Sequence, residues 1–296
     1  MMNKKSLEYC GIKHAGSAEN SVCAPTKKYN HGSCYTNEEL FAIAQAYNEE
    51  YRDNIIVLDK TKNLSEEESK KYLVKELTKR MNTCHDQRCW LRSRFIRRIN
   101  KNLQHELHHN TFKPIGPQGR FKWLNTLDIE NTMKQYEELY PDYKFLSAVP
   151  IDFDDLPSLG IANLNIEDLY KQGKTKIGII YNLDEHYKRG SHWVAGYFDI
   201  KMGKIYFFDS YGSFPEKRIF ALMKRFAKFY YNKEKKIPEI KYNEFRHQYK
   251  NSECGVYSLN FILRLLQGEK FEDVVSHPVN DDAINQCRRA YFDVSY

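Results

Sequence analysis

The feature that most restricts how this chain can fold is an apolar run close to its C-terminus, Cys254–Leu266. The run is apolar on almost every side, and a polar segment, 246–253, leads directly into it. A helix that is apolar all round lies buried beneath other elements rather than on a surface. We therefore expect a central buried helix with Cys254 at its N-terminus.

Strand-like runs before this helix supply a sheet that could cover it. They lie at 145–153, 177–183, 192–200 and 205–209. The short segment 201–204 separates the last two runs, so these two are expected to form a hairpin. A helix near 128–140 places four apolar or aromatic residues on one face, namely Ile129, Met133, Tyr136 and Tyr140. This half of the chain therefore predicts an α+β fold.

The first part of the chain has a helical and charged pattern. Helical spacing marks the segment from Asn37 to Tyr47. Ser65 followed by Glu68 is a capping-box pattern, which predicts the start of a second helix. A third helix is expected at about 87–108.

A domain boundary is expected where two prolines and two glycines within 111–120 interrupt regular structure. It separates a helical N-terminal arm domain, residues 1–110, from a second domain, residues 111–296. The arm holds the excess positive charge of the chain, because eleven lysines and arginines between Lys70 and Lys101 accompany only two acidic residues. Clustered cations bind phosphates without sequence preference, so this segment is a candidate contact for nucleic acid. A solvated helix face or a docking surface for an acidic protein would carry the same charge.

The seven cysteines limit the redox chemistry of the chain. They lie at positions 10, 23, 34, 84, 89, 254 and 287. An odd number and irregular spacing argue against a disulfide framework and favour a reducing compartment, so at least one thiol is expected to be free. Cys84 and Cys89 with His105 and His109 loosely resemble a zinc pattern, but a continuous helix would hold the two pairs about 24 Å apart. We expect no metal and no other cofactor.

No membrane association is expected from the hydropathy of the chain. No window reaches the roughly 20 consecutive apolar residues that a membrane-spanning helix needs. No apolar run follows the lysines near the N-terminus, so a secretion signal is not expected either.

The predicted hairpin places a histidine and an aspartate side by side. His192 begins its first strand and Asp209 ends its second. The start of one antiparallel strand lies beside the end of the next, so both side chains can meet at one rim of the sheet. An imidazole and a carboxylate that orients it need this arrangement.

The segment leading into the buried helix supplies a nucleophile. At a helix N-terminus, Cys254 would meet partial positive charge that favours a thiolate. Gln248, six residues upstream, can direct its amide toward a developing oxyanion, alongside the Cys254 backbone N–H. Gly255 would let the backbone approach a ligand closely. Each residue alone has an ordinary structural explanation, and the order of all of them favours a cysteine protease.

Three motifs in this order resemble those of the adenain and ubiquitin-like-protein (SUMO) protease superfamily, the clan CE cysteine proteases. They are Ser191–Val194, Tyr206–Ser210, and Gln248 followed after five residues by Cys254 and Gly255. The spacing between His192 and Asp209 matches this superfamily as well. The resemblance covers about 120–296 and implies a papain-like core, in which a central mixed sheet packs on the helix that carries the nucleophile.

Within the superfamily, the chain resembles in particular the polyprotein-processing protease of African swine fever virus and related large DNA viruses. The shared features are Arg246-His-Gln248, Glu253-Cys-Gly255 and two cysteines separated by four residues in a helical N-terminal arm. The segment Trp123–Thr126 resembles the Trp-Leu-Asn-Asp motif of the superfamily. Its last residue is threonine instead of aspartate, which is a departure from the cellular deSUMOylating enzymes.

The resemblance also implies hydrolysis after Gly-Gly. Trp123 and Trp193 would form two aromatic walls of a slot too narrow for any Cβ atom. Asn125 and Gly255 complete the expected substrate-binding residues. A tryptophan of the core or of a domain seam is the alternative for each wall.

Three functions remain open at this point. The first is a viral endopeptidase that cuts structural polyproteins during virion maturation, located in the virion and in the host cytoplasm. The second is an isopeptidase that removes SUMO or another ubiquitin-like modifier in a reducing intracellular compartment. The third is an inactive protease fold that binds nucleic acid or serves as a scaffold. The presence of His192, Asp209, Gln248 and Cys254 argues against the third.

Overall fold

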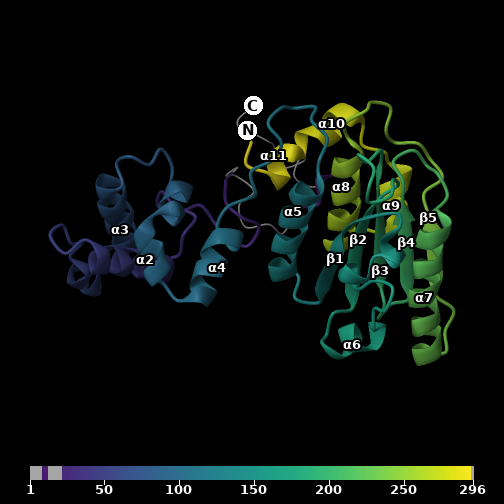
Figure 1. The fold of residues 1–296 in the computed structure, drawn as a ribbon, viewed down its shortest axis with the longest axis horizontal. Helices are drawn as coiled ribbons and strands as arrows, with labels where there is room; N and C mark the ends of the chain where they lie inside the picture. Colours follow the sequence, from purple (N-terminus) through teal and green to yellow (C-terminus); the bar gives the residue numbers. More distant parts are fainter. Residues whose placement is uncertain (1–8, 13–21, 295–296) are drawn as a thin grey trace.

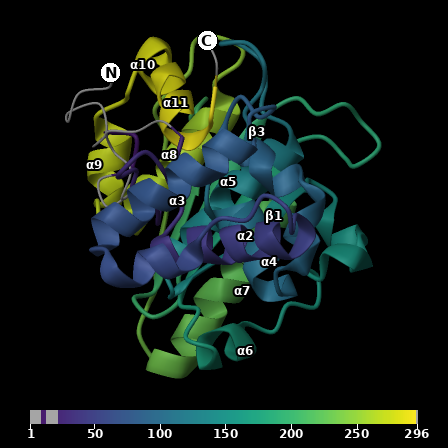
Figure 2. The same cartoon turned by 90° about the vertical axis from the view of Figure 1, so that its left-hand side faces the viewer.

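The computed structural model describes residues 9–12 and 22–294 (Figure 1). Figure 1 shows a smaller helical part, formed by residues 22–110 and called the arm below, beside a larger part in which helices surround a sheet. Turned by 90°, the arm lies in front of the sheet-containing part (Figure 2). Its regular elements begin with α2 (Asn37–Glu50), η1 (Leu58–Asn63) and α3 (Glu66–Arg80).

Two of the predicted helices of the arm form as expected. Thr36 caps α2 and Ser65 caps α3, and each is paired in a capping box with the glutamate three residues on. The residues that α2 buries include Leu40, Ile43, Ala44 and Tyr47. They share one hydrophobic core with Leu73 and Leu77 of α3.

The prediction of a continuous third helix at 87–108 is wrong. The segment forms η2 (Gln87–Arg92), η3 (Arg94–Arg98) and α4 (Lys101–Asn110). The backbone of Ser93 is extended between the first two. Asn100 caps α4 by accepting the N–H of Leu103. Serine and asparagine favour such positions over helix interiors, because their side chains bond to nearby backbone groups.

The expectation of reduced thiols is wrong for six of the seven cysteines. Disulfides join Cys10 to Cys287, Cys23 to Cys34 and Cys84 to Cys89. Cys254 is the free cysteine. Spacing in the sequence does not determine such connectivity, since the partners lie 277, 11 and 5 residues apart. The bond between Cys84 and Cys89 also removes both thiolates from the loose zinc pattern.

The larger part contains a five-stranded sheet in the order β1-β2-β3-β4-β5. The strands are β1 (Tyr143–Pro150), β2 (Lys176–Asn182), β3 (Trp193–Asp199), β4 (Lys204–Phe208) and β5 (Glu239–Tyr242). The β1–β2 and β4–β5 pairs are parallel, whereas β2–β3 and β3–β4 are antiparallel. The sheet is therefore mixed. Asp199 pairs with Lys204 across the tight turn, which confirms the predicted hairpin.

Hydrophobic cores lie on both faces of the sheet. On one face, α8 (Cys254–Leu266) and α5 (Thr126–Leu139) pack on alternate strand residues such as Ala195 and Phe208. On the other face, α7 (Lys217–Glu234) packs on the intervening residues. Every residue of α8 is buried, which confirms the predicted central helix. The remaining short elements are η4 (Phe153–Asp155), η5 (Pro157–Leu159), α6 (Ile166–Lys171), α9 (Phe271–Ser276), α10 (Asp281–Gln286) and α11 (Arg288–Tyr291).

Long-range contacts attach the arm and the N-terminal segment to the sheet-containing part. Arg88 of the arm forms an ion pair with Asp293, with an N–O distance of 2.8 Å. Residues 9–12 lie against α8, where Asn260 donates to the Tyr9 carbonyl oxygen (2.5 Å). The domain boundary expected between residues 110 and 111 stays a prediction.

Within the described ranges, no helix is both long enough and apolar enough to span a bilayer. The N-terminal lysines, which bear on a secretion signal, lie outside those ranges.

The disulfides make a direct prediction about thiol content. The unreduced protein, unfolded in denaturant, should show one reactive thiol, and the reduced protein should show seven. Replacing Cys10 by serine should lower the free energy of unfolding by about 2–5 kcal/mol, because the lost bond closes most of the chain into a loop. Thiol titration and chemical denaturation measure these quantities. The Cys254→Ala variant, with no thiol left before reduction, is the control, and seven thiols in unreduced protein would contradict the pairing.

Candidate active site

The predicted base and its orienting carboxylate meet at one rim of the sheet. His192 directly precedes β3 and Asp209 directly follows β4, so the antiparallel pairing of these strands brings the two residues together. His192 Nε2 lies 2.5 Å from Asp209 Oδ1, and both side chains are buried. A carboxylate in this place sets the orientation and the tautomer of an imidazole.

Asp209 is itself held by several donors. Its Oδ1 accepts the N–H of Tyr211 (2.8 Å), and the Asn243 amide exchanges two hydrogen bonds with the Asp209 backbone (2.9 and 2.7 Å). Burial would raise the pKa of this carboxyl group. Hydrogen bonds and the charge of His192 oppose burial, and the pKa of Asp209 lies below its usual value. The carboxylate is therefore ionised beside the imidazole.

Cys254 begins α8 beside the same imidazole. Burial lowers the pKa of His192, but hydrogen bonds and charges from Asp209 and Cys254 together outweigh burial and raise this pKa to about 9. Since Asp209 occupies Nε2, the Nδ1 edge of the ring faces the thiol. The site can thus hold an imidazolium between the carboxylate of Asp209 and the sulfur of Cys254. A thiolate is the reactive form of a cysteine nucleophile.

A buried carboxylate fixes the chain just before the nucleophile. Glu253 is fully buried, and its oxygens accept the N–H and hydroxyl of Ser252 (2.9 and 2.6 Å) and the amide of Asn285 (2.9 Å). These bonds offset the cost of burying a charge. Because the network ends at the residue before Cys254, it determines where the thiol lies.

Two hydrogen bonds to its side-chain amide hold Gln248 in one orientation. Its Oε1 accepts the hydroxyl of Ser210 (2.7 Å), and its Nε2 donates to the carbonyl oxygen of Lys250 (2.6 Å). A primary amide has two N–H donors, so one remains for an oxyanion after the bond to Lys250. The role of Gln248 in polarising the substrate stays a prediction. The hydrogen bond from Ser210 holds the side chain of Gln248 beside the loop that follows Asp209.

The two tryptophans expected to wall a slot differ in exposure. Trp123 is 47% exposed, whereas Trp193 is only 6% exposed. The indole N–H of Trp193 donates to the carbonyl oxygen of Leu124 (2.9 Å). Trp193 therefore packs in the core and holds the segment that carries Trp123, instead of forming an open wall. Trp123 keeps the exposure that a substrate-binding residue needs.

Gly255 and Asn125 have structural roles that the sequence did not suggest. A Cβ atom on Gly255 would lie 3.0 Å from the Cβ of Leu124, so the close approach at this glycine is made by a side chain of the protein itself. The expected approach of a ligand to Gly255 stays a prediction. The side chain of Asn125 accepts the N–H of Asp128 and caps α5. Substrate binding by Asn125 stays a prediction.

Four residues whose roles sequence reasoning did not identify contact this site: Asn243, Glu253, Tyr211 and Arg246. Glu253 and Arg246 were recognised only as members of motifs. Two of them neighbour recognised positions, since Glu253 precedes Cys254 and Tyr211 lies two residues after Asp209. Their positions in the sequence were a usable signal. The bonds of Glu253 to Ser252 and of Arg246 to Gln248 are local in sequence. The stack of Tyr211 on His192 and the bonds between Asn243 and Asp209 were not predictable, because they depend on how separate loops pack.

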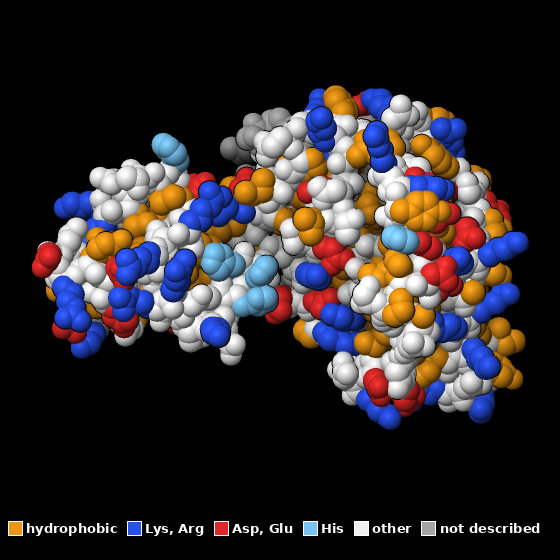
Figure 3. Space-filling view, in the orientation of Figure 1, with side chains coloured by type: hydrophobic (Ala, Val, Ile, Leu, Met, Phe, Trp, Pro, Cys, Tyr) orange, Lys and Arg blue, Asp and Glu red, His pale blue; other side chains and the backbone are white. Residues whose placement is uncertain are grey.

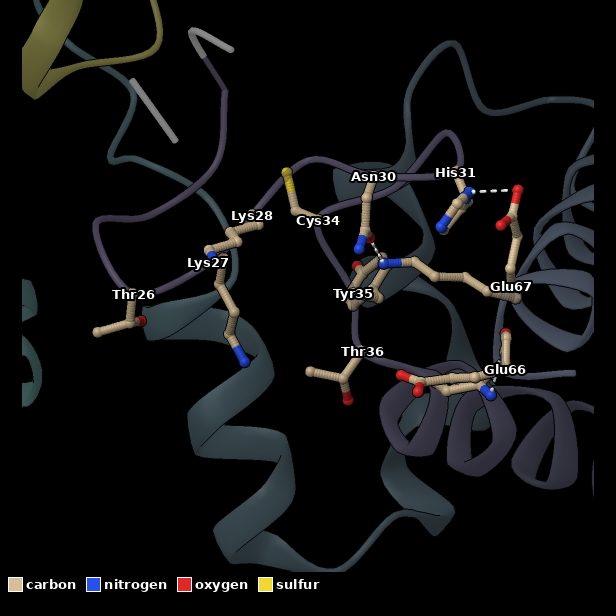
Figure 4. Close-up of a pocket in the computed structure, with 12 residues that line it drawn as sticks. Thr26, Lys27, Lys28, Asn30, His31, Cys34, Tyr35, Thr36, Glu66 and Glu67 are labelled. Carbon is tan, nitrogen blue, oxygen red and sulfur yellow. Dashed lines mark hydrogen bonds and ion pairs between the residues drawn. The ribbon is translucent and has the colours of Figure 1, made fainter. Parts of the chain in front are cut away.

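A pocket in the arm is a second candidate for a ligand site (Figure 4). It has a volume of about 400 Å³ and lies between α2, α3 and the loop before them. Three of its basic side chains have partners within the arm, since Lys27 pairs with Glu39, His31 contacts Glu67, and Lys70 bonds to Asn30. In residues 9–12 and 22–294, no three His, Cys, Asp or Glu side chains gather as a metal site would require. This pocket therefore shows no clear ligand chemistry.

Lysines and arginines are visible over the arm in Figure 3. Six of the eleven cations of 70–101 bond to other residues: Lys70, Lys71, Arg80, Arg88, Arg94 and Arg98. Ion pairs of this kind reduce the positive charge that a phosphate backbone would meet. The nucleic-acid contact stays a prediction, and this pairing weakens it.

The geometry agrees with comparisons to known proteins. Residues 176–295 match the model of the Ulp1 protease family, C-terminal catalytic domain. A putative thiol protease of Acanthamoeba polyphaga mimivirus is 34% identical over 282 residues, which cover 92% of this chain and 93% of that protein. A cysteine protease of African swine fever virus is 23% identical over 62% of this chain and 72% of its own length.

A solved structure shows the same fold. The crystal structure of a protease of African swine fever virus superposes with a TM-score of 0.59 at 21% identity, covering 82% of this chain and 95% of that one. The similarity extends beyond the catalytic domain, since it includes most of both chains. Together with the buried cysteine, histidine and aspartate at the rim of the sheet, these similarities show that the chain belongs to the Ulp1-like, clan CE family of cysteine proteases.

Proposed function

We propose that this protein is an endopeptidase that cleaves after Gly-Gly in viral structural polyproteins. The observation that carries the proposal is the tight covering of the nucleophile. Only 3% of Cys254 is exposed, and the buried side chain of Leu124 packs on the neighbouring Gly255. A substrate with side chains next to the scissile bond would have to displace packed core residues, whereas glycines would not.

The viral part of the proposal rests on the relatives. One is a putative thiol protease of mimivirus and another a cysteine protease of African swine fever virus. Action in the virion and at assembly sites in the host cytoplasm is part of the same proposal.

The site residues suffice for a two-step hydrolysis. The Cys254 thiolate attacks the carbonyl carbon after the second glycine, and the oxyanion accepts hydrogen bonds from Gln248 and the Cys254 N–H. The C–N bond breaks as the His192 imidazolium gives its proton to the leaving amine. Water, deprotonated by the neutral imidazole, then attacks the thioester, and its C–S bond breaks to release the acid and the thiolate. Asp209 orients the imidazole through both steps and stabilises its charge.

Removal of a modifier is the second candidate. In some isolates of African swine fever virus, the related protease bears the name SUMO-1 cysteine protease, and isopeptide hydrolysis would use the same atoms. Incubation with a linear peptide containing Gly-Gly-Xaa and with SUMO or ubiquitin adducts separates the two functions. Turnover of the adducts alone would overturn polyprotein processing.

The nucleophile and base should be indispensable. Cys254→Ala and His192→Ala should each lower kcat/KM on a Gly-Gly-Xaa peptide by about 10⁴-fold or more, because each removes a participant in bond breaking. Circular dichroism of each variant controls for folding. Substantial turnover by folded Cys254→Ala protein would exclude this thiol as the nucleophile.

Glycine selectivity should appear as a steric penalty on the substrate. Replacing either glycine of the peptide by alanine should lower kcat/KM by roughly 10–200-fold, the range expected for an added methyl group in a tight slot. A peptide with alanine two residues after the scissile bond is the matched control. Equal cleavage of all three peptides would contradict the narrow slot.

The pKa of His192 predicts an alkaline limit of activity. The imidazolium is needed to protonate the leaving amine, and it is lost as pH rises through about 9. The profile of kcat/KM against pH should therefore fall on its alkaline side near pH 9. In Asp209→Asn the hydrogen bond to a charged carboxylate and its charge are lost, so this limb should move to lower pH. An unmoved limb would show that His192 does not set it.

A further inference from the structure

A column of flat side chains extends outward from the catalytic imidazole. The ring of Tyr211 lies parallel to that of His192, with centroids 4.3 Å apart and 3° between the planes. The guanidinium carbon of Arg246 lies 5.0 Å from the centre of the Tyr211 ring and 5.0 Å from that of Tyr249. Since the imidazole covers one face of Tyr211, the guanidinium lies over the other. The order is imidazole, phenol, guanidinium, phenol.

Tyr211 and Arg246 are each hydrogen-bonded to a residue of the expected catalytic set. Asp209 Oδ1 accepts from the His192 ring and from the Tyr211 N–H, so one oxygen places the imidazole and the ring stacked on it. Arg246 donates its Nε–H to the backbone carbonyl of Gln248 (2.7 Å). The column therefore connects the base to the loop that carries the expected oxyanion donor.

The two loops that carry the column are in direct backbone contact. The carbonyl oxygen of Ser210 accepts the N–H groups of His247 and Gln248 (2.8 and 2.9 Å). Gly212 has φ +77°, and a Cβ atom there would lie 2.9 Å from the carbonyl carbon of Phe245. Only glycine fits this close approach without a shift. These close backbone contacts between the two loops leave the stacked side chains little freedom to move.

We propose that Tyr211 and Arg246 are positioning residues, which hold the plane of His192 and the Gln248 loop in fixed relation. Hydrogen bonds to Asp209 and Cys254 at two edges of the ring leave the imidazole free to tilt about the line that joins them, and a ring on its face removes this freedom. Aromatic faces attract cations, so an imidazolium and a guanidinium both favour Tyr211 between them. The charged groups that face His192 directly are Asp209 and Cys254, with Arg246 beyond the ring. The inference needs His192 as the base but no particular peptide substrate.

The rate of Cys254 alkylation by iodoacetamide tests this without a substrate. Tyr211→Leu removes the ring, and its alkylation rate at pH 7 should fall about tenfold, whereas Tyr211→Phe keeps the stack and should stay within twofold of the original protein. Arg246→Met should lower the rate about threefold, with Arg246→Lys closer to the original. Tyr187→Leu is the matched control, because Tyr187 also contacts a histidine, His186, and its side chain is exposed. It should change nothing.

Turnover of a cleaved peptide gives a second measurement. Tyr211→Leu should lower kcat with KM nearly unchanged, and should move the alkaline limb of the pH profile down by about half a pH unit, because the imidazolium loses its aromatic partner.

Three results would overturn the proposal. One is a lower melting temperature of Tyr211→Leu with alkylation, kcat and the alkaline limb unchanged, which would mean that the ring is only structural. Another is a raised KM of Arg246→Met with unchanged alkylation, which would mean that Arg246 binds substrate instead. The third applies if Tyr211→Leu fails to fold. Arg246→Met is then the test variant, because the Arg246 side chain is exposed and its replacement should leave the fold intact. An unchanged alkylation rate in Arg246→Met would overturn the proposal.

Discussion

The hydrogen bond between His192 and Asp209 is the contact on which the rest of the site depends. It forms because β3 and β4 are antiparallel, so the residue before β3 and the residue after β4 lie at the same rim of the sheet. The parallel pairing of β5 with β4 then ends both strands at that rim, so Asn243, just after β5, meets the Asp209 backbone. The strand pairing thus delivers the base, its carboxylate and the residue that anchors the carboxylate to one place.

The parts of the site that the sequence predicted are those encoded by local patterns. The apolar run of α8 gave a buried helix, and the short polar turn 201–204 gave the hairpin, so the meeting of His192 and Asp209 followed from geometry alone. Tyr211 and the roles of Glu253 and Arg246 were missed because the contacts concerned join segments that the sequence does not relate. The disulfides were missed for the same reason, since the pairing of Cys10 with Cys287 requires both ends of the chain to meet.

The arm shows how far periodicity predicts helices. Helical spacing predicted α2, and the capping box of Ser65 and Glu68 predicted the start of α3. Between 87 and 108, however, helical spacing continued through Ser93 and Asn100, where the backbone leaves the helix. Charge was equally incomplete as a guide, because a count of lysines and arginines does not show that Glu50 pairs with both Arg94 and Arg98.

The catalytic groups differ in what holds them, and this difference bears on how the enzyme is tuned. Cys254 belongs to a helix buried along its whole length, and His192 and Asp209 adjoin strand ends, so their backbones are fixed by the core. Gln248 lies on a loop, and its hydrogen bonds join it to Ser210, Lys250 and Arg246. Substitutions in the core would therefore tend to destabilise the whole fold, whereas substitutions in this loop can change transition-state stabilisation while the fold is kept.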